Sequence, residues 1–314
     1  MKVIHFYPRS AGIRFLARFK TYLKDRIQDK YTHINRSSTL YNELGNRINQ
    51  TDIIVFTSHG EPEYFVGELE KGTEVQLRLE DLKGVINSFI FAFSCSTGEL
   101  GKKLCEASGA LAYIGFNDAI NLTVNTSEVS FKPQMKVVIN SIYLEALIDS
   151  FNEYFSKTYN VRQFAKLLSL NLKRSYSRVL AADPLDLCKK LSLDNRLAQN
   201  PQFLKALHSD LLTTIDAVRS RIIVHGEQEF IPWNVINNEP EKVLSLIEIL
   251  ESITFSSQNE YYRNFLLSCL YMKSGRPRKA HSYFKLVAKQ FPQFEPLSMY
   301  KVNDDDTELQ EVVS

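Results

Sequence analysis

The sequence has 314 residues, enough for about two domains of ordinary size. Lysine and arginine number 38 against 36 aspartates and glutamates, so the net charge is +2 and no general basic excess attracts nucleic acid or an anionic membrane. Hydrophobic residues make up 44% and charged residues 24%, as in soluble globular proteins, and no apolar run reaches the ~18 residues of a membrane span. The opening segment MKVIHFYPRS does not have the form of a signal peptide.

Cysteine usage indicates a reducing compartment. Four cysteines are too few for a disulfide scaffold in a chain of this length, and no CxxC spacing occurs. The six histidines do not cluster with the cysteines at zinc-site spacing, so we expect no metal and no cofactor. We therefore expect a cytoplasmic protein. The cysteines are Cys95, Cys105, Cys188 and Cys269.

The first 120 residues predict strands that alternate with helices. Several of the strands are apolar along their whole length, which is typical of parallel strands buried on both faces. Such alternation predicts a mainly parallel sheet with helices on both sides. A hairpin over 64–77 interrupts it. Strands are predicted at 3–7, 31–34, 52–57, 88–94 and 111–116, and helices at 12–27, 79–86 and 98–108, with a further helix capped by Ser38 and Thr39 and carrying Leu40, Leu44 and Ile48.

The second half of the chain is mainly helical. Asp183-Pro184 interrupts the helical pattern and predicts a boundary between a domain over 1–182 and a second one over 183–301, followed by a disordered acidic tail at 302–314. The segment 261–291 resembles one tetratricopeptide-type helical hairpin. The other predicted elements are helices at 136–154 and 161–179, a strand at 221–224 and polar loops at 125–133 and 232–240.

Exposed side chains of these helices have ordinary structural interpretations. Lys173, Arg174 and Arg178 on the helix at 161–179 are expected to form a solvated face. Aromatic residues of the last hairpin, including Tyr261 and Phe265, either pack within it or form a docking surface for a partner. These features do not define a function.

Two short segments combine chemically active residues with a favourable position. Thr57-Ser58-His59-Gly60 and Ser94-Cys95-Ser96-Thr97-Gly98 each follow a predicted buried strand, and His59 and Cys95 are 36 residues apart, which leaves room for one crossover. Ligands of open parallel sheets bind at the carboxyl ends of the strands, and neighbouring strands are ~5 Å apart. We therefore expect the imidazole and the thiol to converge on one substrate bond.

The glycines of these segments support a catalytic interpretation. Gly60 permits a sharp turn, and Gly98 begins a helix whose N-terminus is expected to stabilise a thiolate at Cys95. The alternative is that Cys95 is an ordinary core residue, and a second His-Gly pair occurs at His225-Gly226. Order, spacing and strand context together favour the catalytic interpretation. The other three cysteines lie within apolar helical patterns and are expected in the core.

The segments DIIVFTSHG and SFIFAFSCSTGELGKKLCEASGALAYIGF resemble the caspase-like cysteine peptidases, and among these the CHAT group. In that group one strand ends in His-Gly and a second in Cys, followed by a turn, a helix and a Gly-Ala strand. The turn after Cys95 is also similar to that of separases. The resemblance covers about residues 1–175 and departs from caspases proper, whose Gln-Ala-Cys-x-Gly is absent, so cleavage after aspartate is not implied.

This resemblance implies an α/β fold of the caspase-like αβα sandwich type and hydrolysis of peptide bonds by a Cys/His dyad. Cys95 is then the nucleophile, His59 the group that protonates the leaving amine, and the N–H groups of Gly60 and Cys95 the oxyanion hole. Asp118, with Asn117 and Ser94, is a candidate for the first substrate pocket, where it would pair with a basic side chain. Asp118 equally suits a turn cap or a solvent-exposed position.

The sequence thus predicts a cysteine endopeptidase with a protein substrate, regulated by a partner or ligand through its helical half. For a bacterial chain the resemblance implies a role in defence or programmed death, and self-cleavage at 121–132 stays open. A catalytically silent scaffold that acts through protein–protein contacts is the main alternative. A hydrolase or transferase of small acyl substrates is a further one.

Overall fold

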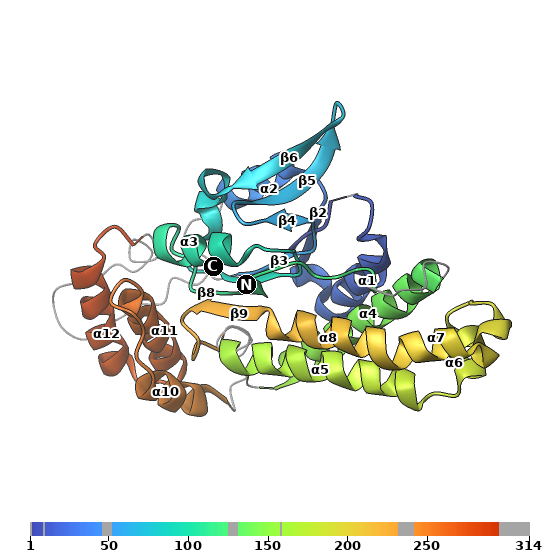
Figure 1. Cartoon of the computed structure of the whole chain (residues 1–314). Helices are drawn as coiled ribbons and strands as arrows, with labels where there is room; N and C mark the ends of the chain where they lie inside the picture. Colours follow the sequence, from blue (N-terminus) through green and yellow to red (C-terminus); the bar gives the residue numbers. More distant parts are fainter. Residues whose placement is uncertain are drawn as a thin grey trace.

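The computed structural model describes residues 2–8, 10–45, 52–124, 131–157, 159–231 and 242–294. Its centre is a six-stranded sheet of order β2-β1-β3-β7-β8-β9, in which the first five strands are parallel and β9 is antiparallel to β8. The fold is therefore α/β with a mainly parallel sheet, as predicted (Figure 1). The strands are β1 (Val3–Phe6), β2 (Tyr31–Ile34), β3 (Ile53–Phe56), β7 (Phe89–Ala92), β8 (Ala112–Phe116) and β9 (Ile222–Gly226).

Apolar residues on both faces of the strands produce two packed layers. Ile53 and Val55 of β3 belong to one hydrophobic cluster, and Ile54 and Phe56 belong to the other, because successive side chains point to opposite faces of a sheet. The first cluster packs α1 (Ala17–Ile27), α4 (Lys132–Ser156) and α5 (Val161–Ala181) on one face. The second packs α2 (Ser37–Gly45), α3 (Gly98–Ala107) and the 3₁₀ segment η3 (Leu79–Val85) on the other.

A small antiparallel sheet of β4 (Gly60–Glu61), β5 (Tyr64–Glu70) and β6 (Thr73–Arg78) projects from the α2–α3 side (Figure 1). It contains the predicted hairpin and begins directly after His59. Phe65 of β5 stacks on Phe56 of β3 with ring centroids 4.1 Å apart, so the ribbon is anchored to the central sheet beside the candidate site.

Helix α2 begins at Ser37, so Ser38 and Thr39 lie inside the helix rather than at its N-cap. Its first amides are not capped by Ser38 or Thr39, because the carboxylate of Glu68 in β5 accepts hydrogen bonds from Ser37 N at 2.9 Å and Ser37 Oγ at 2.8 Å. A carboxylate at a helix N-terminus satisfies donors that have no partner within the helix. The cap is supplied by a distant strand, so it is not evident from the local sequence.

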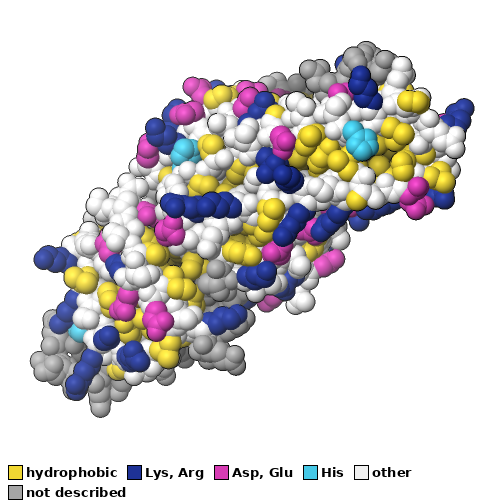
Figure 2. All heavy atoms as spheres, turned by 60° about the horizontal axis from the view of Figure 1, so that its bottom comes forward, with side chains coloured by type: hydrophobic (Ala, Val, Ile, Leu, Met, Phe, Trp, Pro, Cys, Tyr) yellow, Lys and Arg dark blue, Asp and Glu magenta, His cyan; other side chains and the backbone are white. Residues whose placement is uncertain are grey.

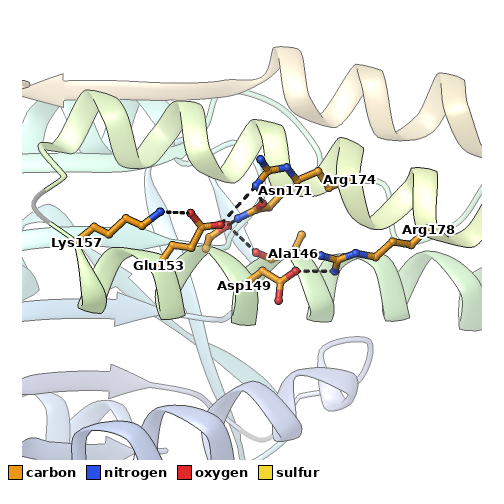
Figure 3. Close-up of polar contacts among 8 residues, drawn as sticks. Ala146, Asp149, Glu153, Lys157, Asn171, Arg174 and Arg178 are labelled. Atoms are coloured by element: carbon orange, nitrogen blue, oxygen red, sulfur yellow. Dashed lines mark hydrogen bonds and ion pairs between the residues drawn. The ribbon is translucent and has the colours of Figure 1, made fainter.

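Helices α4 and α5 form an antiparallel pair with a polar seam (Figure 3). In its buried part, Asn171 of α5 donates to Ser150 Oγ of α4 at 3.1 Å. At its exposed edge, Arg178 pairs with Asp149 at 2.7 Å and Arg174 with Glu153 at 3.5 Å. The predicted basic face of α5 is therefore exposed but partly neutralised by α4, and exposed pairs of this kind contribute little to stability.

Helices α6 (Pro184–Lys190), α7 (Pro201–Lys205) and α8 (Leu211–Ser220) continue the layer formed by α5 (Figure 1). Figure 2 shows this side of the molecule, where hydrophobic, basic and acidic side chains are interspersed. Exposed leucines such as Leu170 and Leu212 lie on α5 and α8. The charge pattern does not define a single-sign surface here, which agrees with the near-neutral composition.

Three helices, α10 (Val243–Ser252), α11 (Glu260–Lys273) and α12 (Pro277–Gln290), form a group beside β9 (Figure 1). The hydroxyl of Tyr261 in α11 donates to Asn87 Oδ1 at 3.1 Å, and Gln258 donates to the Cys105 carbonyl at 3.0 Å. Asn87 precedes β7 whereas Cys95 follows it. The group therefore contacts the opposite end of β7 from the candidate site.

The predicted division at Asp183 can be compared with these elements. Asp183 caps α6 through hydrogen bonds from Leu185 N and Asp186 N, so a helix begins at the predicted break. Strand β9 lies beyond this point and pairs with β8, so the central sheet uses both parts of the chain. The domain boundary stays a prediction.

Some predicted features lie outside the described residues. They are Ile48 of the second helix, the loop residues 125–130 and 232–240, and the tail at 302–314.

Candidate active site

Strands β3 and β7 hold His59 and Cys95 at the same edge of the sheet. The two strands are parallel neighbours, and Phe56 pairs with Ala92 in their register. His59 and Cys95 each lie three residues beyond these paired positions. The sequence-based expectation that one sheet edge carries both side chains therefore follows from the strand register. We call His59 and Cys95 the candidate dyad.

Hydrogen bonds connect the two turns that carry the dyad. Phe93 N donates to the Phe56 carbonyl at 2.8 Å, which extends the ladder beyond the assigned strands. The buried hydroxyls of Ser58 and Ser94 are 3.3 Å apart. The turns before His59 and Cys95 are thus fixed relative to each other.

Gly60 allows the turn after His59 to pack closely on the turn that contains Cys95. A Cβ at position 60 would lie 2.7 Å from the Cys95 carbonyl oxygen and would clash with the methyl group of Thr97. A larger residue therefore cannot fit without moving the Cys95 turn. This explains why glycine follows His59 in this sequence.

A main-chain carbonyl orients the His59 ring. His59 Nε2 lies 2.6 Å from the Ala11 oxygen in the loop between β1 and α1. A carbonyl oxygen only accepts, so Nε2 carries the hydrogen and, in the neutral ring, Nδ1 keeps the free lone pair. Gly12, with φ of +89°, allows this close approach, since a Cβ there would lie 3.2 Å from His59 Cε1. The ring is therefore set up to accept a proton at Nδ1.

The Cys95 thiol is partly buried and contacts the loop that follows β8. Its Sγ accepts a hydrogen bond from Ile120 N at 3.2 Å. Burial raises the pKa of this thiol above its ordinary value, and the negative charges of Glu61 and Asp118 raise it further. The Ile120 amide and the Arg221 guanidinium lower it, but less strongly than burial raises it.

The structure therefore differs from the expectation that the start of α3 favours a thiolate. The hydrogen bond recorded for Sγ comes from Ile120 rather than from an amide of α3, and desolvation outweighs the favourable contributions. Ser96, directly after Cys95, has a φ of +54°, which is unusual for a residue with a side chain. The turn after Cys95 is thus strained at Ser96. Burial, and not this strain, raises the pKa of the thiol.

Arg221 organises the loop that carries Asp118. This arginine follows α8, and its Nη2 lies 3.1 Å from Asp118 Oδ2 while Nη1 donates to the Ala119 carbonyl at 2.5 Å. Its own carbonyl accepts from Asn117 N at 3.0 Å. Asp118, whose side chain is 60% exposed, is therefore already paired with a cation of this chain, and a basic substrate side chain would compete with Arg221.

The other two residues predicted for the substrate pocket have different environments. Asn117 is exposed and packs against Gly98 at the start of α3, where a Cβ would lie 3.1 Å from Asn117 Cα. Ser94 is 1% exposed and makes the contact with Ser58 described above. Ser94 is therefore a buried residue that links the two turns, whereas Asn117 and Asp118 are exposed at the surface.

Sequence analysis missed three contributors to the site: the Ala11 carbonyl, the Ile120 amide and the Arg221 side chain. The first two are main-chain groups, which leave no residue-type signal. Arg221 is 102 residues from Ala119, and no local pattern relates them. Gly12 provides the one usable clue, because a glycine outside a strand or helix often marks a close approach of the backbone.

A second, buried histidine contacts the segment that leads to His59. His5 of β1 makes hydrogen bonds of 2.7 Å with Tyr31 OH and with Thr57 Oγ1, so one ring nitrogen donates and the other accepts. Burial, followed by the charges of His33 and Lys20, holds the pKa of His5 well below its ordinary value. His5 is neutral in the folded protein and fixes Thr57, two residues before His59.

His5 gives a pH dependence of stability. Between about pH 7 and pH 5 the unfolded chain takes up a proton at His5 that the folded chain does not. The free energy of unfolding is therefore expected to decrease as the pH is lowered through this range, by at most ~1.4 kcal/mol per pH unit from this group. His5→Gln is expected to flatten that slope in urea unfolding titrations. His208→Gln, at an exposed position, is the control. Equal slopes for both variants would contradict this role of His5.

Comparison with known proteins yields little. No protein-family model matches the sequence, and no curated protein matches it. Among solved structures, the chain is similar to a secreted C11 cysteine protease from Bacteroides thetaiotaomicron in complex with an irreversible peptide inhibitor, at 10% identity and a TM-score of 0.30, over 71% of this chain and 83% of that one. A likeness this low assigns neither family nor function, which leaves the geometry of the site as the basis for a proposal.

The described residues were also compared with the features of membrane spans and metal sites. None of their helices is long and apolar enough to cross a membrane. No group of three or more His, Cys, Asp or Glu side chains in the described part of the chain is arranged to hold a metal ion.

Proposed function

We propose that this protein is a cysteine endopeptidase in which Cys95 is the nucleophile and His59 the general acid and base. The observation that supports this most strongly is the fixed tautomer of His59: the Ala11 carbonyl binds Nε2–H, which leaves Nδ1 to accept a proton. The register of β3 and β7, which brings the two residues to one sheet edge, is the second.

In the proposed reaction the Cys95 thiol gives its proton to His59 Nδ1 as sulfur attacks the carbonyl carbon of a peptide bond. The resulting oxyanion accepts hydrogen bonds from the N–H groups of Gly60 and Cys95. His59 then returns the proton to the leaving amine, and the C–N bond breaks to give a thioester. Water, deprotonated by His59, hydrolyses the thioester and restores the thiol.

The raised pKa of the Cys95 thiol requires that His59 take the thiol proton as sulfur attacks, because the Ile120 amide lowers this pKa and its displacement would raise the pKa further. In the unliganded protein the Ile120 amide donates a hydrogen bond to Cys95 Sγ. Arg221 holds the loop that carries Ile120 through contacts with Asp118 and Ala119. We therefore propose a low resting activity that rises when substrate or a partner displaces the loop, because this frees the Sγ lone pair for attack while His59 takes the proton.

The finer assignment follows the sequence resemblance. We propose membership of the CHAT group, a protein substrate, an activating partner, a cytoplasmic location and a role in defence or programmed death; the His-Gly and Cys-Ser-Thr-Gly segments support this group. Asp118 is retained as a candidate for the first substrate pocket, with Asn117 at its rim. The pairing of Asp118 with Arg221 means that a basic side chain binds there only if Arg221 moves.

A catalytically silent scaffold is the second candidate function. Two observations favour it: the thiol is partly buried with a raised pKa, and Asp118 is neutralised within the chain. In that case His59 and Cys95 have structural roles only, and His59 does not increase the reactivity of the Cys95 thiol.

Labelling with a peptidyl chloromethyl ketone separates the two. For a peptidase, mass spectrometry is expected to find Cys95 alkylated at least ~10-fold faster than Cys105, which is buried and whose pKa is raised to about 12. His59→Ala is expected to slow labelling of Cys95 and leave Cys105 unchanged. Labelling of Cys95 that is as slow as that of Cys105, or unaffected by His59→Ala, would support the scaffold.

A further inference from the structure

A small basic pocket lies at the carboxyl ends of β1 and β2, next to the loop that orients His59. It has a volume of about 320 Å³, and its lining includes Arg14, Lys20 and His33. Arg14 belongs to the short 3₁₀ segment before α1, Lys20 to α1 and His33 to β2, which packs beside α1 (Figure 1). Elements that are separate in the sequence therefore bring three basic side chains to one cavity.

The pocket is positively charged and lacks an internal counter-charge. Among the described residues that line it there is no aspartate or glutamate, and neither Arg14 nor Lys20 forms an ion pair with a described carboxylate. The charge of Lys20 contributes to the lowered pKa of the buried His5, after burial and His33.

One hydroxyl group of the pocket lacks a hydrogen-bond partner. The Ser10 Oγ is buried and makes no hydrogen bond in the described structure, although a buried hydroxyl without a partner costs about 1–3 kcal/mol. Asn35 adds a side-chain amide to the same lining. An oxygen-rich ligand would satisfy this hydroxyl.

We propose that this pocket binds a small phosphorylated anion, with Arg14 and Lys20 paired to phosphate oxygens and the Ser10 hydroxyl donating to the same group. Arginine offers a planar fork to phosphate oxygens, and lysine adds a point charge. The volume is at the lower end of small-molecule sites, which suits one or two phosphate groups on a small molecule rather than a polymer. This site goes beyond the proposed peptidase activity and does not depend on it.

The position of the pocket connects it with the dyad. Ala11 lines the pocket and also presents its carbonyl to His59 Nε2. The hydroxyl of Tyr7, another lining residue, donates to the carbonyls of Ile13 and Arg14 at 3.2 and 3.3 Å, so the loop that closes the pocket is tied to β1. A bound anion would contact the same loop that orients the imidazole.

The test uses pyrophosphate and the full chain, by isothermal titration and thermal unfolding at constant ionic strength. Pyrophosphate is expected to bind and raise Tm, inorganic phosphate to bind more weakly, and sodium chloride to have no effect. In the variant Arg14→Ala/Lys20→Ala the Kd for pyrophosphate is expected to rise at least tenfold. The matched control is Arg18→Ala/Lys24→Ala, which removes two exposed charges of α1 outside the pocket.

Ser10→Ala provides a second variant that keeps both charges and is expected to weaken pyrophosphate binding severalfold. The proposal is overturned if the pocket variant and the α1 control lose affinity equally, because binding would then reflect general surface charge. It is also overturned if the wild-type protein shows no binding beyond the effect of chloride. Cys95→Ala is expected to bind pyrophosphate like the wild type, so failure of the peptidase proposal would not affect the result.

Discussion

Cys95→Ala and His59→Ala are each expected to lower kcat/KM for peptide cleavage at least ~10³-fold. The thiol forms the bond to the substrate carbonyl, and the imidazole, fixed through Nε2 by Ala11, moves the proton. Residues that act as a unit in this way give non-additive losses, so the double variant should be no slower than the worse single one. The measurement is cleavage of a fluorogenic peptide library and of an unfolded protein, followed by mass spectrometry of the products.

Cys105→Ala is the matched control for this experiment. Cys105 is buried in α3 and distant in function from the dyad, so the variant should keep near wild-type cleavage once its lower stability is taken into account. Cleavage that persists in Cys95→Ala would exclude Cys95 as the nucleophile. Loss of cleavage in Cys95→Ala but not in His59→Ala would instead identify a thiol enzyme with a different base.

The sheet could be predicted from the sequence because its strands are marked by their composition. Segments such as the one from Ile53 to Phe56 are apolar on both faces, and only strands buried between two layers need that pattern. The cap of α2 could not be predicted, because Glu68 reaches it from β5. The antiparallel pairing of β9 with β8 could not be predicted either, because the sequence of a strand does not indicate its direction in the sheet.

For the site, sequence was informative about the two side chains and not about their surroundings. His59 and Cys95 follow apolar strands, and a parallel sheet brings such positions to one edge. The groups that set their chemical state, Ala11 O and Ile120 N, belong to the main chain. The pKa of the Cys95 thiol depends on how deeply the turn is buried. The hydrophobic periodicity of the sequence does not indicate this depth, so the raised pKa could not be predicted.

The second large effect is expected from Phe151→Ala, which should lower the free energy of unfolding by about 3–5 kcal/mol. Phe151 of α4 is fully buried, and its ring centroid lies 5.1 Å from Phe19 of α1, 5.0 Å from Phe91 of β7 and 5.1 Å from Phe164 of α5. Truncation leaves a cavity between four elements and removes edge-to-face ring contacts that contribute beyond the buried area. Urea unfolding followed by circular dichroism measures the change.

The expected loss at Phe151 also bears on the candidate dyad. Helix α1 follows the loop that presents Ala11 to His59, and β7 leads into the Cys95 turn, so one ring packs against the elements that position both dyad residues. Leu170→Ala on α5, at a side chain that is 44% exposed, is the control and should cost less than about 1 kcal/mol. A loss below about 1 kcal/mol for Phe151→Ala would mean that the neighbouring rings repack, and the dyad would then not depend on this cluster for its geometry.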